Sequence, residues 1–425
     1  MMSIKLDQAL LKGFVEPSEI QAINDDAVKA NKALTDGTGA GSEYVGWTNL
    51  PSSLDDALID EITALGKSVK ENSDCIVSIG IGGSYLGIRA TLEYLRDDTL
   101  LPVYYAGHNM SVDYTYQLLE KLKNKNFTVV VISKSGTTTE PALAFRLIKQ
   151  LMKEKYSEEQ MKERIICVTD GAKGALRKTV DAKGYKSYVI PDDVGGRFSV
   201  LTPVGLVPLA LAGVDIKALV DGARVGEREY STGDVTTNTC LQYAASRFVL
   251  YKKGKVIEMQ ASFYDNMQYV SEWWKQLFGE SEGKGGEGIF PASTVLSTDL
   301  HSMGQLMQDG MRNVFETFID VEKSRYSVSI PEDADDLDGF NIVASKDLDY
   351  VNKQAFKATA EAHYEGGVPN MTITLCQADA FHLGQLYYFF ERAVGVSGYL
   401  LKVNPFDQPG VEAYKSKMFA LLGKK

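Results

Sequence analysis

The stretch Asp74–Gly87, DCIVSIGIGGSYLG, decides the fold class of this chain. Its first half is a short apolar run, and its second half is rich in glycine and opens a segment with helical periodicity. Apolar strands that alternate with helices are typical of a parallel sheet covered on both faces. Four more such runs follow, at Pro102–Ala106, Phe127–Ile132, Arg164–Val168 and Tyr185–Ile190. We therefore expect a first α/β domain over residues 61–200.

A second unit of the same kind is expected further along the chain. After a helical connector over residues 201–250, strand–helix alternation resumes within residues 251–402. The expected strands are Lys255–Gln260, Val314–Ile319 and Met371–Cys376, and the expected helices include Gln268–Phe278 and Leu348–Ala362. Residues 1–60 have the period of a helical arm, and residues 403–425 predict a final segment that ends in a helix. The predicted fold is α/β, with two doubly wound parallel-sheet domains that bind a ligand at the carboxyl ends of their strands.

Composition narrows the classes of function. The 425 residues are 44% hydrophobic and 24% charged with a net charge of −11, and no stretch rich in Lys and Arg predicts a nucleic-acid partner. The N-terminus lacks an apolar signal segment, and the longest uncharged run, Phe198–Val214, contains two prolines and is too short to span a membrane. Four cysteines without a CxxC motif suit a reducing cytoplasm, and the histidines lack metal-binding spacing. We expect a soluble, cytoplasmic protein without a structural zinc or a histidine-based metal site.

Two loops that follow predicted strands have the composition of an anion site. Gly80–Gly87 opens a helix, but Tyr85 occupies the position of the last glycine in a dinucleotide fingerprint, which argues against NAD. Ser133–Pro141, SKSGTTTEP, places five hydroxyls and a lysine at the start of another helix. Helix capping alone would explain either loop. Two such loops on one sheet favour a site for a phosphate monoester.

Four ionisable residues stand beside glycines or at helix ends. Arg197 follows two glycines in IPDDVGGRFS (residues 190–199), Glu280 lies in GESEGKGG (279–286), His301 precedes an expected helix, and Lys415 lies on the last one. Each has an ordinary structural explanation when it is considered alone. Together they suit the transfer of a carbonyl between C1 and C2 of a sugar. Glu280 would move the carbon-bound proton, with Glu282 as the alternative base, and Arg197 would stabilise the enediolate oxygen. His301 and Lys415 would open the sugar ring.

Five ordered motifs, SIGIGGSYLG, SKSGTTTEP, DVGGRFS, GESEGK and NPFDQPGVEAYK, resemble those of the glucose-6-phosphate isomerase family in its shorter bacterial form. The resemblance implies two sugar-isomerase (SIS) domains, a homodimer whose histidine comes from the neighbouring subunit, no cofactor, and a role in glycolysis and gluconeogenesis. It implies the same catalytic roles for Glu280, Arg197, His301 and Lys415. It also implies further substrate contacts, to the phosphate from Ser84, Ser133, Ser135 and Thr138 with Lys134 beside them, and to the sugar from Gly83, Gln276 and Gln408.

Other functions remain open at this point. A non-catalytic SIS-domain binder would keep the phosphate loops but would not need Glu280 or Lys415. An isomerase that also accepts mannose-6-phosphate and a glucosamine-phosphate deaminase are further alternatives. A glucosamine-phosphate synthase would need an N-terminal cysteine nucleophile, and no cysteine precedes Cys75. The departures from the family pattern, Pro409 and a short stretch between Glu280 and His301, affect the expected shape of loops and not the proposed catalytic groups.

Overall fold

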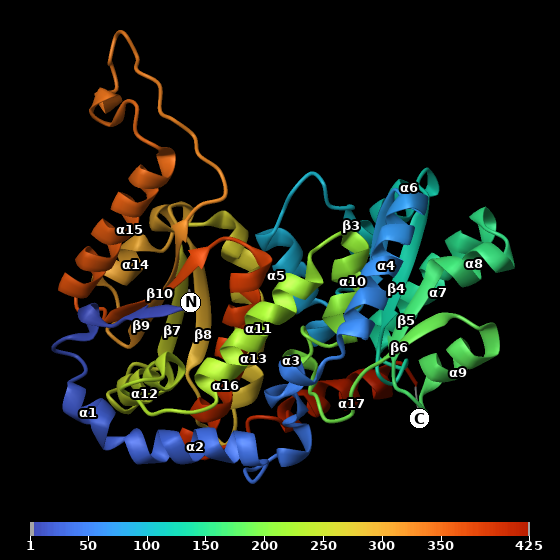
Figure 1. Cartoon of the computed structure of the whole chain (residues 1–425), viewed down its shortest axis with the longest axis horizontal. Helices are drawn as coiled ribbons and strands as arrows, with labels where there is room; N and C mark the ends of the chain where they lie inside the picture. Colours follow the sequence, from blue (N-terminus) through green and yellow to red (C-terminus); the bar gives the residue numbers. More distant parts are fainter. Residues whose placement is uncertain (1–3, 424–425) are drawn as a thin grey trace.

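The computed structural model describes residues 4–423, whose strands form two separate five-stranded sheets (Figure 1). The first sheet has the order β3-β2-β4-β5-β6 and is parallel throughout. Its strands are β2 (Cys75–Ile79), β3 (Val103–Ala106), β4 (Phe127–Ile132), β5 (Ile165–Thr169) and β6 (Lys186–Val189). Because β3 and β4 lie on opposite sides of β2, the winding direction reverses between β2 and β4. In open α/β sheets a ligand binds at the carboxyl edge of such a reversal.

The second sheet has the order β1-β10-β9-β7-β8. Its parallel strands are β7 (Ile257–Ser262), β8 (Phe290–Val295), β9 (Val314–Lys323) and β10 (Asn370–Gln377). The short strand β1 (Lys5–Asp7) pairs antiparallel with β10 at the edge, inside a region that was expected to be helical. The expected class, doubly wound parallel sheets, is confirmed, and β1 is an addition to it.

Apolar side chains point alternately to the two faces of the first sheet, which explains why helices cover both faces. Val77 and Val129 belong to one apolar cluster, and their neighbours Ile76 and Val130 belong to another. Side chains of a strand point alternately to opposite faces, so each face needs its own layer. One layer contains α6 (Val112–Lys123), α7 (Thr139–Lys155), α8 (Glu158–Arg164) and α9 (Ala175–Lys183). The other contains α4 (Asp56–Asn72), α5 (Leu86–Tyr94) and α10 (Pro203–Ala212).

The largest apolar cluster runs between the two sheets. It joins α10 and α5 to the helices on the inner face of the second sheet, α12 (Thr239–Lys252), α13 (Gln268–Glu282) and α16 (Ala380–Leu400). Helix α11 (Ile216–Tyr230) packs along α16, and α13 packs along α5. The outer face of the second sheet is covered by α14 (Gly304–Asp309) and α15 (Leu348–Glu365). The remaining helices are α1 (Pro17–Ala22), α2 (Asn24–Asp36), α3 (Leu50–Ser53) and α17 (Glu412–Leu421).

The helix before Glu280 is longer than the sequence predicted. It was expected to end at Phe278, but α13 continues through Glu282, so the motif GESEGK begins inside a helix. The strand β8 was not predicted, because its sequence FPASTV contains a proline and small residues. A proline is tolerated there because β8 is an edge strand.

Two further features of the described residues bear on the expectations. Between β9 and α15 the chain leaves the body as a long excursion (Figure 1), and its acidic stretch, residues 332–339, is exposed. Among residues 4–423, no helix has both the length and the apolar character needed to cross a bilayer. Even the long, buried α16 carries Glu391 and Arg392.

Candidate active site

Arg197 is the centre of the candidate site. It lies in a single 3-10 turn (Gly196–Phe198) after the carboxyl end of β6, and its side chain is only 2% exposed. The neighbouring glycine loop after β2 touches this turn through its backbone, because a Cβ on Gly83 would lie 1.9 Å from the carbonyl oxygen of Gly196. Only glycine permits so close an approach. Gly83 therefore lets two loops of the first sheet meet around a buried cation, whereas a Cβ on Gly196, next to Arg197, would meet no atom within 4 Å.

Every N–H of the Arg197 guanidinium faces an oxygen atom. Its Nε donates to Ser281 Oγ (2.8 Å), and its Nη2 donates to the carbonyl oxygens of Pro405 (2.6 Å) and Asp407 (3.1 Å). Its Nη1 donates to Gln408 Oε1 (3.0 Å) and, at the longest distance, to Glu280 Oε2 (3.4 Å). Burial lowers the pKa of Arg197, while Glu280 and Asp407 act to raise it. An arginine keeps its charge at any physiological pH.

Glu280 lies on the last turn of α13 and keeps part of its side chain, 27%, exposed to solvent. Gln276, one turn earlier, donates from Nε2 to Glu280 Oε1 (3.2 Å). The other amide atom, Gln276 Oε1, is buried and has no hydrogen-bond partner within residues 4–423. The structure therefore brings together four of the predicted residues: Arg197, Glu280, Gln276 and Gln408.

The two predicted phosphate loops both lie at the carboxyl edge of the first sheet. The first forms a 3-10 turn, Gly82–Ser84, directly before α5, and the second precedes α7 after β4. In the second loop, Ser133 Oγ accepts from Gly136 N (3.0 Å) and Ser135 Oγ accepts from Thr137 N (3.1 Å). Because these loops follow the adjacent strands β2 and β4, they flank the reversal of winding where an anion is expected.

Two further residues of the second loop differ in what their side chains contact. Thr138 occupies the N-cap position of α7, but its side chain makes no capping hydrogen bond. Its exposed hydroxyl is therefore not used by the helix that it begins. Lys134 Nζ forms an ion pair with Asp192 Oδ1 (2.9 Å), across the edge of the sheet.

His301 does not join this cluster within one chain. Helix α13 connects two parallel strands, so it returns from the carboxyl end of β7 to the amino end of β8, and Gly279 accordingly lies against Pro291. His301 ends the 3-10 turn Thr298–His301, beyond the carboxyl end of β8, and is exposed. Six strand residues separate the two ends, a length of roughly 20 Å. His301 and Glu280 of one chain thus lie at opposite ends of β8.

Lys415 shares no hydrogen-bond partner with Arg197 among the described residues. It lies on α17, where its Nζ pairs with Glu412 Oε1 of the same helix (2.8 Å). No residue of α17 from Glu412 to Leu421 is buried. The segment that leads into this helix does reach the site, because Gln408 and the carbonyls before it bind Arg197.

The structure corrects one candidate and adds two residues. Glu282, the alternative base, is fully buried and bound to Arg247, so its carboxylate cannot face a substrate. Ser281 and Lys284 were not predicted to contribute. Ser281 holds Arg197, and Lys284, whose pKa is lowered by burial and by Arg197, pairs with Asp407 (3.2 Å). Both stand in the GESEGK motif, but only the packed structure reveals what their side chains contact.

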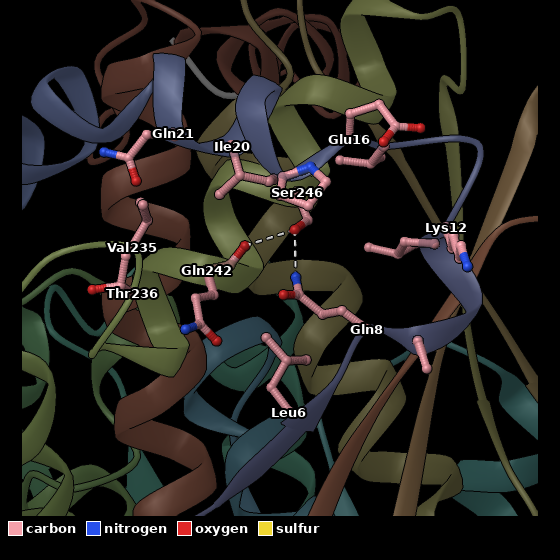
Figure 2. A pocket seen from close by; sticks show the side chains of 14 residues that line it. Leu6, Gln8, Lys12, Glu16, Ile20, Gln21, Val235, Thr236, Gln242 and Ser246 are labelled. Carbon is pink, nitrogen blue, oxygen red and sulfur yellow. Dashed lines mark hydrogen bonds between the residues drawn. The ribbon is translucent and has the colours of Figure 1, made fainter.

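A pocket of about 730 Å³ lies elsewhere, between the N-terminal segment and α12 (Figure 2). Gln8 Nε2 donates there to Ser246 Oγ (2.5 Å), and the hydroxyl of Ser246 donates to the carbonyl oxygen of Gln242 (2.8 Å). None of the predicted site residues lines this pocket. Within the described residues, no group of three or more His, Cys, Asp or Glu side chains is arranged to hold a metal ion.

The chain is similar to known proteins over almost its whole length. The family model described as phosphoglucose isomerase matches residues 56–422. The glucose-6-phosphate isomerase of Enterococcus faecalis is 50% identical over 100% of this chain and 97% of its own length, and that of Clostridium novyi is 51% identical over 99% and 96%.

Solved structures agree as well. The crystal structure of a hypothetical protein from Thermus thermophilus covers 99% of both chains with a TM-score of 0.90 and 28% identity. That of a glucose-6-phosphate isomerase from Chlamydia trachomatis has a TM-score of 0.80 at 19% identity, covering 99% of this chain and 88% of its own, and so shows the shared fold. With the family model matching most of its length and relatives about half identical from end to end, this chain belongs to the phosphoglucose isomerase family.

Proposed function

We propose that this protein interconverts glucose-6-phosphate and fructose-6-phosphate by moving a proton between C1 and C2 through an enediolate. The observation that carries the proposal is the meeting of a partly exposed carboxylate, Glu280, with a buried, permanently charged guanidinium, Arg197. Such a pair supplies a base for the carbon-bound proton and a cation for the oxygen that becomes negative. The membership of the family supports the same assignment.

Proton transfer would begin and end at Glu280. Its carboxylate takes the proton from C1 of fructose-6-phosphate, the electron pair of that C–H bond forms the C1=C2 double bond, and the carbonyl electron pair moves onto O2. The hydroxyl proton of O1 then passes to O2. The electron pair left on O1 forms the aldehyde, while the double-bond electrons take the proton back from the carboxylic acid of Glu280 at C2. The bond from Arg197 Nη1 to Glu280 is the longest that the guanidinium makes, at 3.4 Å. An enediolate oxygen would therefore take this N–H most readily, while Ser281, Gln408 and two backbone carbonyls keep the guanidinium in place.

The sugar phosphate would be held by the two loops of the first sheet. Ser84, Ser133, Ser135 and Thr138 supply hydroxyls and backbone N–H groups at helix starts, with Lys134 beside them. Lys134 now pairs with Asp192, an exposed contact that a phosphate could replace. Gly83 and the amides of Gln276 and Gln408 would line the sugar between these loops and Glu280.

Ring opening would be carried out by His301 and Lys415, with His301 supplied by a second copy of the chain in a homodimer. The position of His301, at the far end of β8 from Glu280, supports this arrangement, since one chain alone separates the two groups. We also propose a cytoplasmic location, which is supported by four buried cysteines without a disulfide in the described residues.

The test is direct. The purified chain is incubated with fructose-6-phosphate, and the product is identified by NMR with and without exhaustive chelation by EDTA, with mannose-6-phosphate as a parallel substrate. We expect glucose-6-phosphate in both conditions, because the proposed chemistry uses only side chains. Failure to form glucose-6-phosphate would refute the proposed function. Loss of turnover with EDTA, restored by a divalent ion, would refute the metal-free mechanism.

A further inference from the structure

The end of α13 carries charges that its own helix disfavours. Glu280 and Glu282 both lie in the last turn, where the partial negative charge of the helix dipole repels a carboxylate. Gly279 precedes them and Gly283 follows, which weakens the turn further. The last turn of a helix lacks partners for its carbonyls and is the part that frays first. A catalytic base on such a turn would be poorly placed unless something else holds the turn.

A buried arginine on another helix binds this last turn. Arg247 of α12 donates from Nη1 to Glu282 Oε1 (2.5 Å) and from Nη2 to Glu282 Oε2 (3.3 Å), and both side chains are fully buried. The guanidinium also lies over the ring of Phe278, 4.3 Å from its centre. Glu282 Oε2 accepts a second bond, from Ile289 N (3.3 Å), where the chain enters β8.

Arg247 is itself fixed to the centre of the second sheet. Its Nε donates to Glu258 Oε2 of β7 (2.5 Å), and its Nη1 donates to Ser397 Oγ of α16 (2.8 Å). Glu258 Oε1 in turn accepts from the hydroxyls of Tyr243 and Thr317, each at 2.7 Å. The last turn of α13 is thus tied by charged hydrogen bonds to two strands and two other helices.

We infer that Arg247 and Glu282 are positioning residues, which hold the last turn of α13 so that Glu280 and Ser281 meet Arg197 in the geometry required for proton transfer. The inference rests on the proposed function and deepens it. Three consecutive residues divide the work: Glu280 faces the substrate, Ser281 binds Arg197 Nε, and Glu282 anchors the turn. Neither Arg247 nor Glu282 touches the reacting atoms.

A contribution to folding stability is a poor explanation for this buried array of Arg247, Glu258 and Glu282. A fully buried ion pair loses its hydration, and replacing one by apolar residues of similar volume is often neutral or stabilising. The array holds two carboxylates and one guanidinium, so removing Glu282 leaves Arg247 paired with Glu258 and no uncompensated charge. A Glu282 variant is therefore expected to fold.

The experiment compares wild type with Glu282→Gln and Glu282→Leu. For fructose-6-phosphate we expect kcat to fall about tenfold or more while KM changes by less than about twofold, because the phosphate loops are untouched. In D₂O, the ratio of solvent deuterium incorporated to hydrogen transferred should rise, because a loosely held base exchanges its proton before returning it. Amide hydrogen exchange of residues 279–284 should accelerate by about tenfold or more in both variants.

The matched control is Glu316→Gln. Glu316 is an equally buried carboxylate in β9 of the same sheet, and it pairs with His363 Nδ1 (2.9 Å), away from α13. We expect this variant to leave kcat, the exchange ratio and the amides of 279–284 as in wild type. If both Glu282 variants keep the protection of 279–284, or if the control loses as much kcat as they do, the positioning role is wrong. If wild type itself fails to isomerise, the proposed function fails, and the amide exchange still tests whether Glu282 holds the turn.

Discussion

The carboxylate of Glu280 lies 3.4 Å from Nη1 of Arg197, although 83 positions separate the two residues in the sequence. Arg197 is almost fully buried, while Glu280 keeps a solvent-facing side. This difference assigns their tasks, because a fixed charge suits a site without water and a base must reach its substrate. The predictions below test the parts of the site one at a time.

Glu280→Gln should abolish isomerisation while leaving the fold and phosphate binding intact. A carboxamide cannot accept the carbon-bound proton, and a positioned general base contributes about 10²–10⁴-fold to the rate. The measurement is deuterium entry at C1 of fructose-6-phosphate in D₂O, followed together with anomer interconversion, which His301 and Lys415 should still support. Glu272→Gln is the control, because Glu272 lies on the same helix and pairs with Lys275 away from Arg197. Exchange at wild-type rates in the Glu280 variant would show that another group is the base.

The double variant Ser135→Ala/Thr138→Ala should weaken binding of the sugar phosphate and change kcat little. Each hydrogen bond to a charged group contributes roughly 1.5–3 kcal/mol, so KM and the affinity for a competitive sugar-phosphate inhibitor should change by at least about tenfold. Ser157→Ala is the control, since Ser157 caps α8 and its loss affects only that helix. Unchanged inhibitor affinity in the double variant would place the phosphate elsewhere.

Mixing two inactive variants should restore activity if a dimer completes the site. In a heterodimer of Glu280→Gln and His301→Ala chains, one of the two sites contains both native residues. After subunits are exchanged by mild denaturation and refolding, random pairing should recover roughly a quarter of the wild-type activity. Each variant refolded alone is the control. No recovery, with heterodimers demonstrated by mass spectrometry, would mean that His301 acts within its own chain or has no role.

Glu391→Gln should stabilise the protein increasingly as pH rises from about 5 to 8. Glu391 is buried in α16, its Oε1 has no hydrogen-bond partner among residues 4–423, and burial raises its pKa well above the usual range. The folded chain therefore keeps a proton that the unfolded chain releases, and the free energy of unfolding falls with pH by up to about 1.4 kcal/mol per unit. A glutamine side chain does not titrate, so the variant lacks this fall in the free energy of unfolding. The measurement is urea unfolding of both chains at several pH values, and a pH-independent difference between them would contradict the assignment.

Local sequence patterns predicted most of the strands. Phe127–Ile132 was predicted to the residue, because five apolar residues and one threonine in a strand buried on both faces leave little ambiguity. The two edge strands of the second sheet were missed for the opposite reason. β8 contains Pro291 and is only partly buried, and β1 is three residues long and gains its place by pairing with β10, which is distant in sequence.

The chemistry of the site was also readable from the sequence, since Arg197, Glu280 and the hydroxyl loops stand in distinctive local motifs. The sequence did not show, however, how these residues come together in the folded chain. Gly83 must touch Gly196, Ser281 must find Arg197, and Glu282 must reach Arg247 on another helix before Glu280 has a fixed position. Residue types and short-range periodicity are encoded within a few positions of the chain. Which buried charges pair with one another, and which carboxylate of GESEGK remains open to a substrate, depends on contacts between distant segments that only the packed tertiary structure creates.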